Sequence, residues 1–392
     1  MYRTPDLFIF HIPKKKMNNE EYFEKMASIQ QKIEIYINQE EDDESENDDI
    51  KSIFTKEQIL EDRLIFKSVL SLLSKLAKNH CHPSHFISKI RTIFHSIKSD
   101  IHENFSNSEI FDIFKSQKLI LLFLIEEKII FIDKTISDII LKGKYAKFHY
   151  PEFFYPEIKQ FIDELTNQDI LALLPQDFEK NRQKGENEEY ICQLIREDSV
   201  KEFIIFVNKY NYNLNSKIKT SIFETNSFLL KKVPTLIEYA AFYGSIQILK
   251  YLFLNNVSIS PSLWFYVIHS NNPEIIHFLE EQDIKPEDET YEKCLEESIK
   301  CHHNEIADYF LYNFINEEDK CNFNNNVYSY GFHYRNFLYF PKDQNNRFSF
   351  YYACRYNYIN IVENFLKNKN LDINEKIIKQ IILFNENILL FF

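Results

Sequence analysis

Apolar residues recur at helical spacing along residues 234–259, PTLIEYAAFYGSIQILKYLFLNNVSI. The apolar positions are Leu236, Ile237, Ala240 and Ala241 in the first half and Ile246, Ile248, Leu249, Leu252 and Phe253 in the second. Gly244 lies between the halves, where glycine reaches left-handed dihedral angles at little cost. The pattern therefore predicts two short antiparallel helices joined by a tight turn. A helix pair this short cannot bury both of its faces alone, so it needs copies on either side.

The same two-helix pattern recurs along the C-terminal half of the chain. We place the copies at residues 190–214, 234–260, 261–286, 290–314 and 348–374, with a partial unit at 376–392 and insertions at 215–233 and 315–347. Aligning the second helices brings into register Phe203, Ile248, Ile275, Ile306 and Ile361. Copies that are not separated by an insertion are offset by roughly 27 to 31 residues, a period typical of helical repeat proteins.

Two kinds of motif resemble ankyrin repeats. Residues 235–244, TLIEYAAFYG, match the T-P-L-H-x-A-A-x-x-G of that family, although Pro234 precedes the threonine, and residues 371–374, LDIN, resemble its A-D-V-N. More narrowly, the runs REDSVKEF, FETNSFL, LIEYAAFYGSIQILKYL, PSLWFYVIHS and IKCHHNEIADYF resemble a large ankyrin family of trichomonad protists. That family carries an N-terminal helical region of unassigned function, and the resemblance covers nearly the whole chain.

The copies depart from the family at the turn glycine, which only residues 234–260 retain. The equivalent positions are Ser199, Asn271, His302 and Asn357. Asparagine tolerates left-handed geometry better than most residues, so Asn271 and Asn357 are expected to preserve the turn. Serine and histidine tolerate it less well, which leaves the repeat boundaries at Ser199 and His302 open.

The resemblance implies an all-α fold, an ankyrin-like helical-hairpin solenoid with degenerate repeats preceded by an N-terminal helical domain. In ankyrin stacks the residues after the paired alanines face the concave surface, where partner proteins bind. The corresponding residues here are Glu197, Asp198, Phe242, Tyr243, His269, Ser270, Lys300, Cys301, Arg355 and Tyr356. Aromatic and arginine side chains are good anchors on such a surface. The alternative for Phe242 and Tyr243 is that they only cover the neighbouring repeat unit. Trp264 aligns with a core position and is expected to be buried.

The N-terminal half predicts an arm over residues 1–19 and a helical domain over 20–144. Residues 40–49, EEDDESENDD, repel one another and predict a flexible acidic loop. Ser108 is a candidate helix start, without a glutamate three residues later. Residues 145–189 are expected to be a linker region, because Pro151 and Pro156 interrupt any regular helix across its first part.

Composition excludes several classes of protein. Acidic residues outnumber basic ones by 59 to 46, giving a net charge of −13, which argues against a nucleic-acid partner. The four glycines are scattered singly, which excludes phosphate-binding glycine loops. The six cysteines show no paired framework and indicate an intracellular protein. With no apolar run long enough to span a membrane, we expect a cytoplasmic or nuclear protein.

The most suggestive chemical cluster is the run His80-Cys81-His82-Pro83-Ser84-His85. Imidazole and thiolate suit zinc, but adjacent side chains cannot all reach one ion, and no second pair follows at a zinc-finger spacing. The alternative is a polar turn between helices. No motif places a cysteine or serine nucleophile beside a base, so no catalytic residue, no metal ligand and no cofactor are assigned.

From these patterns and the resemblance we expect a non-enzymatic scaffold or adaptor that binds a protein partner on the concave face of an ankyrin-repeat stack. Two alternatives stay open. One is a metal-binding protein that uses the run at residues 80–85. The other is an oligomeric structural protein that associates through the apolar end Leu389-Leu390-Phe391-Phe392.

Overall fold

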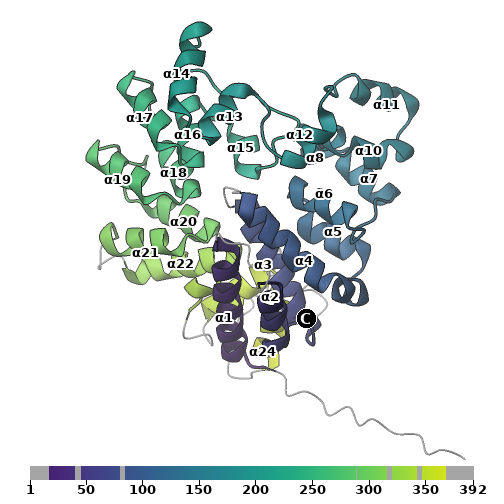
Figure 1. Cartoon of the computed structure of the whole chain (residues 1–392). Coiled ribbons are helices and arrows are strands. Elements are labelled where there is room, and N and C mark those ends of the chain that lie inside the picture. The colour runs from purple at the N-terminus through teal and green to yellow at the C-terminus, as the bar shows by residue number, and fades with distance from the viewer. Residues whose placement is uncertain are drawn as a thin grey trace, which may run out of the picture. The chain divides into compact units, whose positions relative to one another are not determined.

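The computed structural model describes residues 17–39, 46–79, 84–287, 289–315, 320–341 and 347–367, which form an all-helical protein (Figure 1). Within these ranges, β-type pairing is limited to one isolated antiparallel bridge between Lys217 and Thr235. The chain divides into two compact units, residues 29–340 and residues 1–28 with 341–392. None of the described helices combines the length and the apolar character that crossing a bilayer requires.

Amphipathic helices make up the N-terminal part of the larger unit. They are α1 (Asn19–Asn38, which enters this unit at residue 29), α2 (Glu46–Lys56), α3 (Arg63–Asn79), α4 (Ser84–Asn104), α5 (Asn107–Phe114), α6 (Lys118–Glu126) and α7 (Lys134–Ile140). In α3 the buried positions recur every three or four residues, at Ile65, Val69, Leu72, Leu73 and Leu76. This spacing puts them on one face, as the helical period requires.

Two helix starts differ from the sequence-based expectation. The cap of α5 is Ser106, whose hydroxyl accepts the Glu109 N–H while the Glu109 carboxylate accepts the Ser106 N–H, so the expected start at Ser108 was two residues late. α2 begins at Glu46, so residues 46–49 of the expected acidic loop are helical. Acidic residues suit the first turn of a helix because its N-terminus carries partial positive charge. Residues 40–45 lie outside the described residues.

The expected linker region is occupied largely by short helices. They are α8 (Gly143–Lys147), α9 (Tyr150–Phe153), α10 (Tyr155–Ile158), η1 (Lys159–Phe161), α11 (Glu164–Leu171) and α12 (Phe178–Lys184). Pro151 and Pro156 fall in the first turns of α9 and α10, where proline is tolerated because its missing N–H has no partner there. Phe153 and Phe154 are fully buried, so this stretch is packed into the unit.

Helix pairs fill residues 190–313. They are α13 (Tyr190–Arg196) with α14 (Val200–Lys209), α16 (Leu236–Tyr243) with α17 (Ile246–Leu254), α18 (Leu263–Ser270) with α19 (Pro273–Glu281), and α20 (Glu292–Cys301) with α21 (Asn304–Asn313). The first helices of the pairs pack side by side in chain order, α13 on α16, α16 on α18 and α18 on α20. Ala240 and Ala241 are fully buried, which lets α16 approach its neighbours closely. α15 (Ser227–Lys232) lies in the first expected insertion.

A left-handed residue lies one or two positions after the first helix of each pair. These residues are Asp198, Gly244, Asn271 and His302, with φ between +46° and +75°. Ser199, the expected turn position in the first pair, has φ −78° and is the N-cap of α14, so the expectation was wrong by one residue. His302 adopts the left-handed conformation although its side chain is disfavoured there, so the turn is set by the packing of the pair rather than by residue type.

The core of the helix pairs is continuous from Ile191 to Val327. Trp264 is fully buried at its centre, and its indole N–H donates to the Ile284 carbonyl at 2.9 Å. The alignment of Trp264 with a core position is therefore confirmed. Leu252 is also fully buried, and complete burial of such a side chain is worth roughly 1.5 to 3 kcal/mol.

The N-terminal helices pack directly on the helix pairs. α3 lies against α20 and α15. Asn79, the last residue of α3, donates from its side chain to the Lys300 carbonyl at 2.8 Å, and its own carbonyl lies 2.8 Å from His269 Nδ1. On α1, Gln30 donates to Asn336 at 2.8 Å. The two regions that the sequence separates by a linker therefore share one compact unit.

The second expected insertion contains a helix, α22 (Lys320–Tyr334), and the short turn η2 (Phe337–Tyr339). α22 packs against α20, and Phe332 is fully buried. The insertion is thus part of the larger unit through residue 340.

The smaller unit contains the start of α1, α23 (Arg347–Arg355) and α24 (Ile359–Lys367). α23 and α24 pack together, with the rings of Phe350 and Phe365 5.4 Å apart. Asn357 between them is left-handed, as expected for the turn of a helix pair. Residues 1–16 of the expected arm over residues 1–19 and the half repeat at 376–392 lie outside the described residues, and Asn19 already belongs to α1.

Candidate functional site

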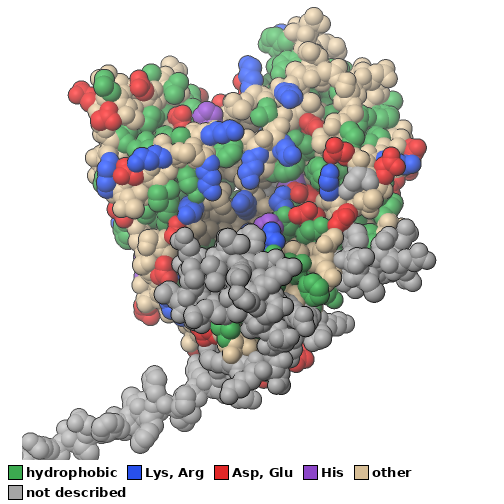
Figure 2. Space-filling view, turned by 180° about the vertical axis from the view of Figure 1, so that it is seen from behind, with side chains coloured by type: hydrophobic (Ala, Val, Ile, Leu, Met, Phe, Trp, Pro, Cys, Tyr) green, Lys and Arg blue, Asp and Glu red, His purple; other side chains and the backbone are tan. Residues whose placement is uncertain are grey.

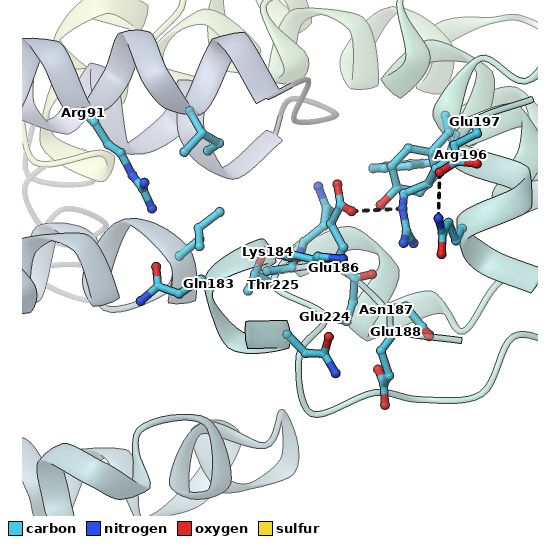
Figure 3. A pocket seen from close by; sticks show the side chains of 18 residues that line it. Arg91, Gln183, Lys184, Glu186, Asn187, Glu188, Arg196, Glu197, Glu224 and Thr225 are labelled. Atoms are coloured by element: carbon cyan, nitrogen blue, oxygen red, sulfur yellow. Dashed lines mark hydrogen bonds and ion pairs between the residues drawn. The ribbon is translucent and has the colours of Figure 1, made fainter. Parts of the chain in front are cut away.

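A cavity of about 510 Å³ opens where the first helix pairs meet the N-terminal helices. Its lining comes from α4 and α6, from the end of α12 and the segment after it, from the end of α13, from residues 224–226, and from the end of α16 (Figure 3). Ligand pockets in proteins typically measure roughly 300 to 1,000 Å³. The size and the polar lining make this cavity the candidate functional site.

Gly185 forms one wall of the cavity and fixes its shape. It ends α12 with φ +68°, a left-handed conformation that side chains disfavour. A Cβ at this position would lie 3.0 Å from the methyl carbons of Leu119 and 3.1 Å from the Thr225 hydroxyl. The Gly185 carbonyl accepts the Thr225 hydroxyl at 2.6 Å, which joins the two segments that line the cavity. Both the backbone angle and the space therefore require glycine.

Glu224 places a buried carboxyl group in the cavity wall. Its Oε1 accepts the Asn226 N–H at 2.8 Å, whereas its Oε2 is buried and has no hydrogen-bond partner among the described residues. Burial raises the pKa of Glu224 to about 7, although the Asn226 N–H and the charges of Arg196 and Lys118 oppose the shift. At neutral pH this group can therefore act as a hydrogen-bond donor or acceptor toward a ligand.

Lys118 lies behind Glu224 and is fully buried. Its ammonium donates to the carbonyls of Ile222 and Glu224 at 3.2 Å each. It also lies 5.2 Å from the centre of the Phe153 ring. Burial lowers the pKa of Lys118 to about 7, so the amine and the carboxyl group behind the cavity both titrate near neutrality.

Arg196 is held in place on the α13 side of the cavity. Its Nη1 donates to the Tyr239 hydroxyl at 2.8 Å, and its Nε pairs with Glu186 at 3.0 Å. Its guanidinium also lies 5.9 Å from the centre of the Tyr243 ring. Figure 3 shows the ion pair between Arg196 and Glu186 on one side of the cavity and Arg91 on the other.

Arg91 extends from α4 with its guanidinium 5.3 Å from the centre of the Phe123 ring. Its Nε is buried and makes no hydrogen bond in the described part of the chain. Amide side chains fill much of the lining between Arg91 and Arg196, namely Asn181, Gln183, Asn187, Gln193 and Asn226. The site therefore offers a guanidinium and a carboxyl oxygen with unused hydrogen-bonding capacity, with amides between them.

The described residues that line the cavity include no cysteine, serine or histidine. Cys192 lies nearby on α13, but burial raises the pKa of its thiol to about 12, so it stays protonated at neutral pH. The chemistry of the lining suits reversible recognition of a polar group by hydrogen bonds and charge.

Three of the residues predicted from the sequence line this cavity: Glu197, Phe242 and Tyr243. Glu197 is exposed and accepts from Gln193 at 2.8 Å, and Tyr243 is half-buried. Phe242 is only 1% exposed, and it stacks near His269 with ring centres 5.4 Å apart. Glu197 and Tyr243 are therefore accessible to a ligand, whereas most of Phe242 covers the neighbouring helices.

Asp198 has a role within the chain. Its carboxylate accepts the N–H groups of Gln247 and Ile248 at 3.0 and 2.9 Å, at the start of α17. Negative charge and hydrogen-bond acceptors stabilise a helix N-terminus. Asp198 thus links one helix pair to the next.

The structure does not bring Ser270, Arg355 and Tyr356 into the cavity. Ser270 donates to the Val267 carbonyl at 2.7 Å, within its own helix. Arg355 and Tyr356 belong to the smaller unit, where Arg355 donates to the Tyr351 hydroxyl at 3.1 Å.

His269, Lys300 and Cys301 meet under the end of α3 in a buried network. Glu297 joins them, with its Oε1 2.7 Å from His269 Nε2 and 2.5 Å from the Lys300 ammonium. Burial by itself would raise the pKa of Glu297, but the hydrogen bonds and charges of His269 and Lys300 outweigh it and hold that pKa at about 2. Asn79 closes the network from α3, so His269 and Cys301 are covered by the chain itself, whereas the Lys300 side chain is partly exposed.

His269, Glu297 and Cys301 are also close enough together to be considered as metal ligands. The two ring nitrogens of His269 face the Asn79 carbonyl and the Glu297 carboxylate, both of which accept hydrogen bonds. Both ring nitrogens therefore already have hydrogen-bonding partners within the chain, which leaves the ring less available to an ion. Burial raises the pKa of the Cys301 thiol well above its usual value, which disfavours a thiolate ligand.

The run at residues 80–85 does not add a site to this picture, because residues 80–83 lie outside the described residues. Arg91, Glu186, Arg196 and Glu224 are the site residues that sequence reasoning missed. Two signals were present, because the FETNSFL run, which contains Glu224, and the REDSVKEF run, which begins with Arg196, were singled out as motifs. No local pattern indicates, however, that α4 and α12 contribute to the same cavity.

Comparison of the chain with protein-family models, with curated proteins and with solved structures finds no match.

Proposed function

We propose that this chain is a non-enzymatic interaction protein, an ankyrin-like solenoid of degenerate helix pairs related to the trichomonad ankyrin proteins that its motifs resemble. The side-by-side order of α13, α16, α18 and α20 supports this assignment. So does the left-handed turn that recurs at Asp198, Gly244, Asn271 and His302. A cytoplasmic or nuclear location fits the buried cysteines Cys192, Cys294, Cys301 and Cys354, none of which forms a disulfide in the described part of the chain.

The partner-binding site is the cavity between Arg91 and Arg196, rather than the whole face formed by the first helices. α3 already covers that face at the His269 side chain and at the backbone of Lys300, through Asn79. The end of α16 and the end of α13 remain accessible at Tyr243 and Glu197. A partner that recognises the helix pairs therefore reaches them at the cavity.

The observation that carries the proposal is the lining of the cavity. Carboxamide side chains both donate and accept hydrogen bonds, as do the N–H and C=O groups of a peptide backbone. The guanidinium of Arg91 and the free Oε2 of Glu224 can each bind a charged or polar group of such a segment. We therefore expect the ligand to be a short segment of a partner protein.

A peptide library displayed on phage, panned against the whole purified chain, tests this function without knowledge of the partner. The charge reversals Arg91→Glu and Glu197→Lys change the cavity, and Lys201→Glu and Glu202→Lys make the same changes on exposed positions of α14. Isothermal titration of the selected peptides is expected to show a loss of at least about tenfold in affinity, about 1.4 kcal/mol, for the cavity variants only. Circular dichroism confirms that each variant is folded.

Two results would overturn the proposal. One is that no selected peptide binds more tightly than about 1 mM. The other is that the cavity variants and the α14 variants bind the selected peptides equally well, which would place recognition elsewhere.

A further inference from the structure

The larger unit contains a cluster of cations beside the end of α3. Lys75 and Lys78 are one helical turn apart on α3, so their side chains lie on the same face. Because α3 packs on α20 and α15, this face comes next to Lys300 at the end of α20 and Lys231 at the end of α15. Figure 2 shows Lys and Arg side chains gathered across the middle of one face.

The neighbours that act electrostatically on Lys75 and Lys78 are cations. They are Lys78, Arg335 and Lys300 for Lys75, and Lys231, Lys300 and Lys144 for Lys78. Burial and then these like charges lower the pKa of both amines to about 8. Neither ammonium has a hydrogen bond or an ion pair with any residue of the described chain.

Lys300 differs from the other lysines because it is paired. Its ammonium lies 2.5 Å from the Glu297 carboxylate and 5.7 Å from the centre of the Phe228 ring. Glu296 also contributes negative charge near Lys300. These groups fix the position of Lys300 at the edge of the cluster and leave Lys75 and Lys78 as its uncompensated centre.

Such a cluster is unfavourable unless an anion binds to it. Positive charges that are close together and partly removed from solvent repel one another, and each lowers the pKa of the others. The rest of the chain is strongly acidic, with a net charge of −13, so these cations are not part of a generally basic surface. The concentration of positive charge at one place therefore indicates an anion-binding site.

We propose that Lys75, Lys78, Lys231 and Lys300 form a binding site for a compact anion that carries several phosphate groups. Lysine ammonium groups bind phosphate as point charges, and several converging lysines match an anion with several charges. A long polyanion is disfavoured, because the chain as a whole carries a net charge of −13 and would repel the parts of such a molecule that extend beyond the cluster. This inference is independent of the proposed peptide site.

Inorganic tripolyphosphate is the probe for the phosphate chemistry. Isothermal titration with the whole chain at about pH 8 is expected to show saturable binding that weakens as salt is added. Bound phosphate stabilises the charged amines, so binding is also expected to take up protons, which appears as a dependence of the measured heat on the ionisation enthalpy of the buffer.

The double variant Lys75→Gln/Lys78→Gln removes the centre of the cluster. The matched control, Lys201→Gln/Lys250→Gln, removes the same charge from exposed positions of α14 and α17. We expect the first variant to bind tripolyphosphate at least about tenfold more weakly and to take up no protons on binding. The control is expected to keep the wild-type affinity and the wild-type proton uptake. Without the probe, the first variant is expected to melt at a higher temperature than the control, because its folded state is relieved of repulsion.

Vesicles separate a lipid headgroup from a free phosphate compound as the source of the anion. Sedimentation with vesicles that contain a phosphorylated inositol lipid, compared with phosphatidylserine vesicles of equal charge, would assign a headgroup if only the first bind. Binding of tripolyphosphate with no vesicle binding would assign a free compound. The proposal fails if tripolyphosphate does not bind below about 1 mM, or if the control variant weakens binding as much as the double variant.

Discussion

Replacement of Lys118 by methionine gives the sharpest test of the charge arrangement behind the cavity. Lys118 is the first residue of α6 and is fully buried. Its ammonium donates to the carbonyls of Ile222 and Glu224, and the charged groups that act on it are the carboxyl groups of Glu224 and Glu152. Methionine fills a similar volume without a titrating group.

The sign of the effect follows from proton binding in the two states. Burial lowers the pKa of Lys118 from 10.5 to about 7 in the folded chain. Between these values the unfolded chain binds more protons than the folded chain, so the free energy of unfolding rises with pH. One proton corresponds to a slope of about 1.4 kcal/mol per pH unit, or about 3 kcal/mol between about pH 7 and about pH 9.5.

The Lys118→Met variant lacks this rise of the free energy of unfolding with pH. Glu224 adds to the resulting difference in stability between the wild-type chain and the variant. The charge of Lys118 lowers the pKa of Glu224, so its removal raises that pKa above the present value of about 7. When the pKa of a carboxyl group is raised in the folded state, the free energy of unfolding falls as pH rises toward that pKa. The wild-type chain is therefore expected to gain stability relative to Lys118→Met across the whole interval.

Urea unfolding followed by circular dichroism at a series of pH values measures this difference. Lys201→Met, on the exposed face of α14, is the matched control, and its difference from wild type is expected to stay flat. The reasoning is refuted if the difference between wild type and Lys118→Met changes by less than about 0.5 kcal/mol from about pH 7 to about pH 9.5. Such a result would mean that Lys118 keeps its proton when buried.

Three further substitutions test the fold by denaturant unfolding. Gly185→Ala is expected to lower the free energy of unfolding by roughly 2 kcal/mol or more, because the added methyl group meets Leu119 at 3.0 Å and the backbone is left-handed. Gly143→Ala is the control, since Gly143 is also left-handed but has open space around it, and it should cost only about 1 kcal/mol. Equal costs for the two variants would mean that the cavity wall moves to accommodate the methyl group. Leu252→Ala is expected to cost roughly 2 to 5 kcal/mol as a buried truncation, and a loss below about 0.5 kcal/mol would contradict the position of α17. Asp198→Ala is expected to cost roughly 1 to 2 kcal/mol through loss of its two bonds to α17, and no loss would show that water replaces the carboxylate.

Local patterns predicted the helix pairs well. The apolar spacing around Gly244 gave two helices that the structure has at 236–243 and 246–254. The turn at Asn271 was also predicted, because asparagine favours the left-handed conformation there. The turn of the first pair was placed at Ser199 instead of Asp198, since aligning on the second helices leaves the position of the turn uncertain by one residue.

The stretch with the two prolines shows where a local rule is too coarse. Pro151 and Pro156 prevent one long helix, as expected, but each lies in the first turn of a short helix. Aromatic residues between them, such as Phe153 and Phe154, become buried by contacts with distant parts of the chain. The sequence therefore indicated the breaks correctly, whereas the ordered packing between them depends on tertiary contacts that periodicity does not encode.

The candidate site shows the same limit more clearly. The resemblance to ankyrin repeats selected His269, Lys300 and Cys301 as surface positions, and the helix-pair geometry does put them on a common face. The structure covers that face with the end of α3, so His269 and Cys301 are buried. Nothing in the spacing of residues 260–301 reveals this, because the covering residue, Asn79, lies about 190 residues earlier in the chain.

The polar contacts of the covering helices explain why they belong with the helix pairs. Asn79, Gln30 and Lys118 each bond to backbone or side-chain groups of the helix pairs and their insertions in buried surroundings. Buried polar groups that lose their partners cost about 1 to 3 kcal/mol each, so removal of the N-terminal helices would leave several of these costs uncompensated together. The N-terminal helices therefore act as part of the scaffold that shapes the cavity, since α4 and α6 supply Arg91 and Leu119 to its lining. The proposed recognition at this cavity would therefore depend on both halves of the chain, because the helix pairs alone lack the part of the lining that α4 and α6 supply.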